Sequence, residues 1–242
     1  MGIPRFFCPE PLPEPGPFRL PEALAHHATR VLRMREGDEL VLFDGRGGEV
    51  PARLGRDARC WHADLGIGVA VERESPLEVV LVQSLASADK MDWVVQKAVE
   101  LGVAAVVPLD AERSVLRLTG ERAAKRLAHW QQVAVAACEQ CGRNRVPRIE
   151  AVTGLQDYLA RTRSLPDRFV LAPGGARGMR AIERPRGPVH VLVGPEGGWS
   201  EAELTTLQLA ACRTLTLGPR VLRTETAGLA ALSAIQALWG DF

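Results

Sequence analysis

The chain has few of the residues on which several protein classes depend. It has 242 residues but only five cysteines, which are too scattered for a disulfide framework. Cys138 and Cys141 form a C-x-x-C pair, but a zinc ribbon needs a second pair and none exists. A redox motif of this kind should open a helix, whereas this pair ends a helical pattern. We therefore expect reduced thiols and no metal site.

Long hydrophobic runs and an excess of one charge are also lacking. No apolar stretch approaches the length of a membrane span and no secretory signal opens the sequence, so we expect a cytoplasmic protein that does not enter a membrane. The net charge of +1 gives no global signature of nucleic-acid binding. Lysine is scarce, and 27 of the 30 basic residues are arginine. Arginine suits phosphate and base recognition, but genomic base composition can produce the same bias and is the favoured explanation.

The amino-terminal part has a pattern of short strands. A helix is expected over Leu20–Met34, and an Asp44-Gly45 hairpin signal stands within the strand-like stretches. The segment Phe6–Phe18 is too rich in proline for regular structure in its second half. The pattern predicts a small β-barrel over residues 1–73, followed by a second domain over 74–242. The strand-like stretches are Glu39–Asp44, Glu49–Leu54 and Trp61–Glu74.

From Leu77 onward, apolar strands alternate with amphipathic helices. This alternation predicts an α/β fold with a parallel sheet. Helices are expected over Asp89–Val103, from Glu121 to near Gly142, and over about Thr224–Trp239. The strands are expected within Leu77–Ala86, Ala104–Asp110, Asp167–Pro173, Pro188–Gly194 and Arg213–Gly218.

The stretch "LVGPEGGWSEAEL" runs from Leu192 to Leu204 and places a glycine turn after a strand. Ser200 and Glu203 form a capping box, so a helix begins at Ser200. A glycine turn between a strand and a helix is a common ligand position, although it can also be only a tight turn. Phosphate is disfavoured, because Glu196 would repel it and no G-K-[ST] motif occurs. S-adenosylmethionine, which is cationic at sulfur and carries no phosphate, fits better.

Two further stretches carry polar clusters. "LTLGPRVLRTETAGLAAL" (Leu215–Leu232) places polar residues before an apolar helix, with Thr224 as a plausible N-cap. Its polar residues can equally serve the helix dipole and the solvated surface. "CEQCGRNRVPRIE" (Cys138–Glu150) places three arginines and an asparagine after a helix, which favours contact with RNA or another acidic ligand. Arginine is also favoured there by the helix dipole alone.

These three stretches together resemble the 16S ribosomal RNA uridine-N3 methyltransferases, a family within the SPOUT superfamily of RNA methyltransferases. The segments "IPRFF", "HHATRVLRMREGDELVLFDG" and "KMDWVVQKAVELGV" agree with the same family, so the resemblance covers nearly the whole chain. It implies a PUA-like barrel that binds RNA and a SPOUT domain whose carboxyl end forms a trefoil knot. It also implies S-adenosyl-L-methionine as cofactor, 16S rRNA or the small ribosomal subunit as partner, and a homodimer.

Residue type and motif position suggest catalytic and RNA-binding residues, and the resemblance implies the cofactor-binding residues. Arg223 would stabilise charge developing on uracil, and Glu225 would be the base or would orient Arg223. Arg143 and Arg145 would bind phosphates and Asn144 a base edge, with Arg5, Arg30 and Arg33 on the amino-terminal RNA surface. The expected cofactor-binding residues are Leu171, Ala172, Pro173, Gly194, Pro195, Glu196, Gly197, Gly198, Leu217, Gly218, Leu222, Arg223, Thr224, Thr226 and Ala227.

Three alternatives stay open at this point. The chain could be a methyltransferase of the same fold acting on another RNA, or an RNA-binding protein without enzymatic activity. A nucleotide-dependent oxidoreductase or NTPase on a Rossmann-like sheet is the third, and it is disfavoured by Glu196 and by the missing phosphate motifs. The sequence does not identify the modified nucleotide, or whether free RNA or an assembled subunit is the substrate.

Overall fold

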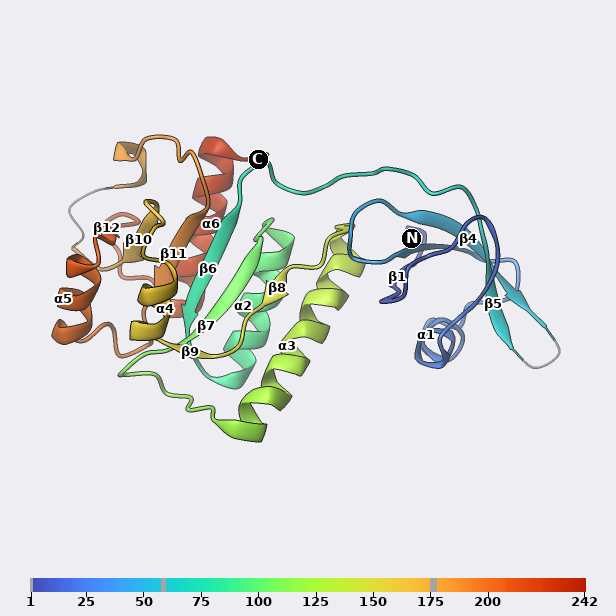
Figure 1. Ribbon diagram of the computed structural model, residues 1–242, viewed down its shortest axis with the longest axis horizontal. Coiled ribbons are helices and arrows are strands. Elements are labelled where there is room, and N and C mark those ends of the chain that lie inside the picture. Colours follow the sequence, from blue (N-terminus) through green and yellow to red (C-terminus); the bar gives the residue numbers. More distant parts are fainter. Residues whose placement is uncertain (1, 58–59, 175–177) are drawn as a thin grey trace. The chain divides into compact units, whose positions relative to one another are not determined.

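The computed structural model describes residues 2–57, 60–174 and 178–242. The contacts divide the chain into two compact units (Figure 1). The first comprises Met1–Glu74 and Cys138–Val146, and the second comprises Ser75–Ala137 and Pro147–Phe242. The segment Cys138–Val146 thus joins the first unit, although the sequence pattern placed it in the second domain.

The first unit is built on a five-stranded mixed sheet in the order β1-β3-β4-β5-β2. β1 pairs with β3 in parallel, and the other neighbours are antiparallel. Alternate residues of β3 and β4, such as Leu40, Leu42 and Leu54, are buried in one core, as expected for a half-buried sheet. The strands are β1 (Arg5–Phe7), β2 (Gly16–Arg19), β3 (Glu39–Phe43), β4 (Val50–Arg56) and β5 (Trp61–Leu65).

Two details of this unit differ from the sequence expectation. The proline-rich segment was expected to lack regular structure, yet its end forms β2, which includes Pro17. Proline is tolerated there because β2 is an edge strand with a neighbour on one side only. The strand expected over Trp61–Glu74 ends at Leu65, and beyond it the chain forms an isolated bridge between Glu49 and Val69 in place of a continued strand.

The helix expected over Leu20–Met34 is shorter and irregular. It consists of α1 (Glu22–His26) and a π-helical turn, η1 (His27–Val31). Arg33 follows with a φ of 56°, the left-handed conformation that commonly ends a helix and that glycine adopts more easily. Arg30, Arg33 and Arg35 are exposed around this end.

The second unit is a parallel sheet in the order β12-β10-β11-β6-β7-β8, with β9 paired to β7 (Figure 1). β6 and β11 are buried along their whole length, as expected for strands covered on both faces. The strands are β6 (Val79–Ser84), β7 (Ala105–Asp110), β8 (Arg148–Ile149), β9 (Thr153–Gly154), β10 (Arg168–Leu171), β11 (Val189–Val193) and β12 (Arg213–Leu215).

Helices cover both faces of this parallel sheet. α4 (Leu155–Arg161) and α5 (Glu201–Leu209) share a core with the Val80 and Leu192 side of the strands. α6 (Thr224–Trp239) packs on β6, β11 and α2 (Ala88–Glu100), where Gly228 lies against Leu81 and Val193. The bounds of α6 agree with those expected. The remaining helices are α3 (Gly120–Cys141) and the 3-10 turn η2 (Met179–Ala181).

The parallel α/β sheet and the separate mixed sheet confirm the predicted fold class. β12 lies at the edge beside β10, yet α6 returns to β6 and β11. The trefoil knot stays a prediction of the resemblance, because the path between β10 and β11 passes through residues 175–177, outside the described residues. Among the described residues, no helix combines the length and the apolar character that a membrane crossing requires.

Candidate functional site

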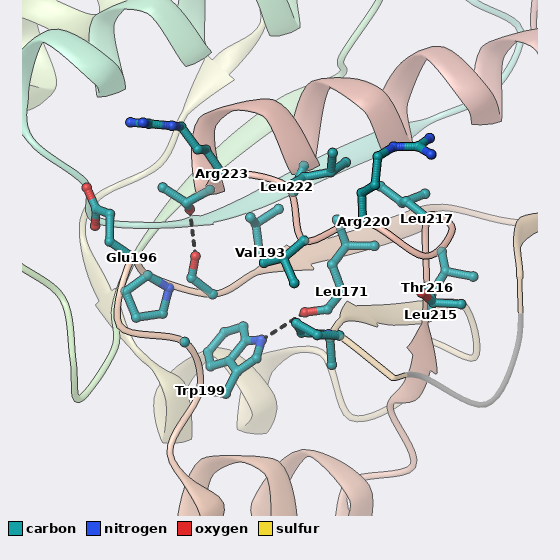
Figure 2. A pocket seen from close by; sticks show the side chains of 18 of the residues that line it. Leu171, Val193, Glu196, Trp199, Leu215, Thr216, Leu217, Arg220, Leu222 and Arg223 are labelled. Carbon is teal, nitrogen blue, oxygen red and sulfur yellow. Dashed lines mark hydrogen bonds between the residues drawn. The ribbon is translucent and has the colours of Figure 1, made fainter.

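Three loops that follow adjacent strands enclose one cavity of about 680 Å³ (Figure 2). They follow β10, β11 and β12, whose parallel alignment brings their carboxyl ends to the same edge of the sheet. A volume in this range is ordinary for a small-molecule site.

The glycine turn after β11 depends on close packing. A Cβ atom at Gly194 would lie 3.0 to 3.2 Å from the indole of Trp199, which is tighter than ordinary contacts. The indole Nε1 of Trp199 donates to the carbonyl oxygen of Leu171 at 3.2 Å, as Figure 2 shows. Gly198 has a φ of 69°, and its N–H donates to the carbonyl of Pro195 at 2.9 Å. Trp199 therefore joins the loops after β10 and β11, a role that the sequence pattern did not suggest.

The amino end of α5 is closed to an anion. The predicted capping box is confirmed: the Ser200 hydroxyl accepts from the Glu203 N–H, and the Glu203 carboxylate accepts from the Ser200 N–H at 2.9 Å. Arg113 donates to the carbonyl of Gly197 at 3.2 Å and holds the turn from the other side. The two capping bonds occupy the N–H groups of Ser200 and Glu203, which a phosphate could otherwise bind, and this strengthens the argument against a phosphate ligand.

The start of α6 differs from the expectation in one point. Arg223, not Thr224, is the N-cap, and no side chain caps this helix end. The Thr224 hydroxyl instead donates to the carbonyl of Gly194 at 2.6 Å and accepts from Gln83 Nε2 at 2.9 Å. Thr224 and Gln83 are both buried at the sheet edge, where an unpaired polar group is costly. The Thr224 hydroxyl therefore links β6, the glycine turn and α6.

The charged groups of the cavity separate into two sets. Lys90 Nζ lies 3.3 Å from Glu196 Oε1 and 3.4 Å from Glu225 Oε2. The buried Glu225 Oε2 accepts no hydrogen bond among the described residues. Arg220 and Arg223 are exposed, and Figure 2 shows their guanidinium groups directed to opposite sides, Arg223 on the side of Glu196. Since Glu225 pairs with Lys90, no contact supports the expectation that it orients Arg223.

All but two of the residues expected to bind the cofactor line this cavity. Gly197 and Thr226 do not; Gly197 faces Arg113, and Thr226 is exposed beyond the first residues of α6. Lys90 was missed because its local pattern is that of any lysine on a helix surface. The other lining residues that sequence reasoning missed are Gly174, Val193, Trp199, Leu215 and Thr216. Pro219, Arg220 and Val221 also line the cavity and lie within the loop from Leu217 to Ala227 that was expected to hold the cofactor.

The residues expected to bind RNA are not all accessible. Asn144 is fully buried; its amide donates to Glu49 and to the carbonyl of Val71 at 3.0 Å and accepts from Arg5. Arg143 is buried and forms an ion pair with Glu74. These contacts lie within the first unit and occupy the groups that were expected to read RNA. The motif "CGRNR" therefore holds the segment Cys138–Val146 in the first unit, because its acidic partners come from distant parts of the sequence.

The titration of this cluster agrees with a structural role. Burial raises the pKa of Glu49, but hydrogen bonds from Arg73, Arg5 and Asn144 outweigh it and hold that pKa at about 2. Burial also raises the pKa of the Cys138 thiol to about 12, so this member of the C-x-x-C pair is an unreactive thiol. All five cysteines are free. Among the residues that the structure describes, no group of three or more His, Cys, Asp or Glu could hold a metal.

Three of the expected RNA contacts are accessible. Arg30 and Arg33 are exposed, and they have no ion-pair partner among the described residues of the chain. Arg145 is also exposed, but its Nε lies 3.0 Å from Glu72.

The chain combines a small mixed sheet with a parallel sheet that has a partly apolar cavity at the carboxyl ends of its strands. These features define a class of α/β proteins that bind a small molecule at the ends of their strands. Comparison with known families narrows this class. Residues 73–236 match the family described as RNA methyltransferase domain, and residues 20–58 match the RNA methyltransferase PUA domain. The chain belongs to this family of RNA methyltransferases.

Individual relatives agree with the family. The chain is 39% identical over 220 residues to ribosomal RNA small subunit methyltransferase E of Bacillus subtilis, covering 87% of this chain and 86% of that protein. It is similar to the crystal structure of ribosomal RNA small subunit methyltransferase E of Neisseria gonorrhoeae bound to S-adenosyl methionine, with 41% identity, a TM-score of 0.92 and 100% of both chains covered. A methyltransferase structure from Legionella pneumophila, also with bound SAM, has 34% identity, a TM-score of 0.94 and full coverage of both chains.

Proposed function

We propose that this protein transfers a methyl group from S-adenosyl-L-methionine to N3 of a specific uridine in 16S ribosomal RNA. The observation that carries the proposal is the cavity at the ends of β10, β11 and β12, which lies where the family motifs fall. The relatives that are named small subunit rRNA methyltransferases, and the similar structures with bound SAM, support it.

The chemistry of the cavity fits this cofactor. Its wall of Leu171, Val193, Leu215, Leu217 and Leu222 suits an adenine ring. The carboxylates of Glu196 and Glu225 suit a cationic ligand, and Glu225 Oε2 accepts no hydrogen bond from the described residues although it lies 3.4 Å from Lys90 Nζ. Backbone groups of Ala172, Pro173, Gly194, Pro195, Gly198, Gly218 and Ala227 would complete the binding set, with side chains of Arg223 and Thr224.

The protein's residues would act mainly through alignment and electrostatics. When bound, S-adenosylmethionine supplies a methyl group activated by the sulfonium. N3 of uridine carries a proton that must leave before its lone pair can react, so a base and a cation are needed. Glu225 Oε2 is our candidate to accept that proton. Arg223, which has no ion-pair partner among the described residues, would stabilise the anionic uracil.

RNA binding is assigned to the first unit. Arg30 and Arg33 would contact phosphates, because they are exposed and have no acidic partner in the described part of the chain. Arg145 would have to leave Glu72 to do so. Arg5, Arg143 and Asn144 would act indirectly, by holding the segment that carries Arg145. Replacing Arg30 or Arg33 by Ala should reduce the salt dependence of RNA binding by about one unit of slope, and an unchanged slope would contradict that contact.

We further propose that the protein is a homodimer that acts in the cytoplasm, where its ribosomal substrate is found. Apolar side chains on the carboxyl-terminal part of the second unit support a self-association surface: Val221, Leu238 and Phe242 are exposed. Sedimentation equilibrium should give twice the mass of the 26.3 kDa chain, and a monomer at micromolar concentration would contradict the proposal.

The central experiment is methyl transfer to small ribosomal subunits that lack the modification. With labelled S-adenosylmethionine, the label should appear in 16S rRNA at N3 of one uridine. Arg223→Ala should slow the transfer by about 10²–10³, as for the loss of one group that stabilises developing charge. Arg122→Ala, an exposed arginine of α3, is the control. Label in another RNA would favour the alternative substrate. If the protein bound RNA but calorimetry detected no heat of binding for S-adenosylmethionine, a non-enzymatic RNA-binding protein would be favoured.

A further inference from the structure

Lys90 places its ammonium group between two carboxylates at the edge of the cavity. Its Nζ lies 3.3 Å from Glu196 Oε1 and 3.4 Å from Glu225 Oε2. The three residues come from the first turn of α2, the glycine turn after β11 and the first turn of α6. A single lysine thus connects three elements that are separate in the sequence.

These charges are partly removed from water. The side chains of Lys90, Glu196 and Glu225 are 31%, 27% and 14% exposed. Lys97, two turns later on the same helix, pairs with Glu100 and with no other acidic group in the described part of the chain, and it is not among the residues that line the cavity. Because partial burial lowers the effective dielectric, the charge of Lys90 influences a ligand in the cavity more than an open surface lysine would.

We propose that Lys90 determines how strongly the cavity prefers a positively charged sulfonium ligand over the neutral thioether that remains after methyl transfer. The proposal rests on the proposed function, because it takes S-adenosylmethionine as the ligand. Glu196 and Glu225 attract a sulfonium, whereas the Lys90 ammonium repels it and offsets that attraction. The neutral thioether experiences neither effect to first order.

This balance has a consequence for the rate of the reaction. The positive charge on sulfur disappears as the methyl group leaves, so any stabilisation of the sulfonium is lost on the way to the transition state. Two carboxylates without a compensating cation would bind the ground state better than the transition state, which lowers the rate at saturation. Lys90 removes this excess ground-state stabilisation while the carboxylates remain available, Glu225 as the candidate proton acceptor.

The test uses the full chain with Lys90→Met, which keeps the aliphatic stem and removes the charge. Calorimetry should measure the affinities for S-adenosylmethionine and S-adenosylhomocysteine separately. We expect the ratio of the two affinities to shift toward the sulfonium by about tenfold, as for one unit charge several ångströms away at intermediate dielectric. Lys90→Arg should retain the ratio of the unmodified protein, and Lys97→Met is the matched control. At saturating RNA, Lys90→Met should lower both kcat and KM for S-adenosylmethionine.

Other outcomes would overturn the proposal in recognisable ways. Parallel loss of both affinities, or loss of all binding in a folded variant, would mean that Lys90 contacts a group shared by the two ligands. An unchanged ratio of the two affinities would mean that the charge of Lys90 does not affect the energy of the sulfonium. If the unmodified protein bound neither ligand, the proposed function itself would fail, and this result is distinct from either of the others.

Discussion

The hydroxyl of Thr224, in the first turn of α6, donates a hydrogen bond of 2.6 Å to the carbonyl oxygen of Gly194 in the glycine turn after β11. Gln83, fully buried at the end of β6, donates to the same hydroxyl at 2.9 Å. Thr224 and Gln83 are buried, so water competes little for the bond between them. The loop after β11 and the start of α6 are thus joined by the chain itself.

Replacing Thr224 by Val, which keeps the shape of the side chain but removes its hydroxyl, should therefore weaken the connection between the walls of the cavity. The change removes the donor to the Gly194 carbonyl and leaves the Gln83 amide with the Ser84 carbonyl alone, at a cost of about 1–3 kcal/mol in the free energy of unfolding. Affinity for S-adenosylmethionine should fall with it. Urea denaturation and calorimetry measure the two effects. Thr226→Val, at an exposed site on the same helix, is the control, and equal stability of both variants would contradict the role of this bond.

Gly194 is expected to tolerate no side chain. An added Cβ would lie 3.0 Å from Nε1 of Trp199, whose indole is buried and bound to the Leu171 carbonyl. Gly194→Ala should then displace the indole and cost about 1–3 kcal/mol in stability, as other overpacked sites do. Tryptophan fluorescence and thermal denaturation would report the change. Gly187→Ala, where a Cβ meets nothing within 4 Å, should be neutral or slightly stabilising. If the two variants were equally stable, the packing argument would fail.

Local patterns in the sequence predicted those parts of the site that depend on neighbours along the chain. The capping box at Ser200 and the bounds of α6 were correct because such signals act within one helical turn. The pairing of Lys90 with Glu196 and Glu225 was missed because it spans more than 100 residues and has no local signature. The motif around Asn144 was assigned to RNA because its buried partners, such as Glu49, also lie far away in the sequence.

Long-range pairing also explains the error at Thr224. Its position and residue type are those of an N-cap, and only the approach of Gly194 and Gln83 in three dimensions gives its hydroxyl another use. Sequence patterns therefore identify which loops form the cavity, whereas the contacts that hold those loops together require the folded chain.

Glu49 should make the first unit sensitive to acid. Its pKa in the folded protein is about 2, below the ordinary value of 4.5, so it stabilises the fold above pH 4.5 and loses this effect as the pH falls toward 2. With one pKa unit worth about 1.4 kcal/mol, the loss is on the order of 3 kcal/mol. Glu49→Gln should be less stable than the unmodified protein at pH 7 but similar near pH 2. Denaturation curves at both values test this, and a constant difference would contradict it.

His190 should produce a second loss of stability at higher pH. It is buried on β11, with its Nδ1 3.0 Å from the Tyr158 hydroxyl. Burial, and to a lesser extent the charge of Arg168, lowers the pKa of His190 from 6.5 to about 4. The folded protein therefore favours the neutral ring. Its contribution to stability is complete above pH 6.5 and is lost as the pH falls toward 4, because the unfolded chain then binds the proton more readily.

The expected size of this loss is about 3 kcal/mol between pH 6.5 and pH 4. His190→Asn removes the titration and retains an acceptor for Tyr158, so its absolute stability should fall but its stability should depend less on pH in this interval. His26→Asn, at an exposed site on α1, should keep the dependence of the unmodified protein. Urea denaturation of the three proteins at several pH values provides the measurement. An equal pH dependence of the His190 variant and the unmodified protein would show that another group is responsible.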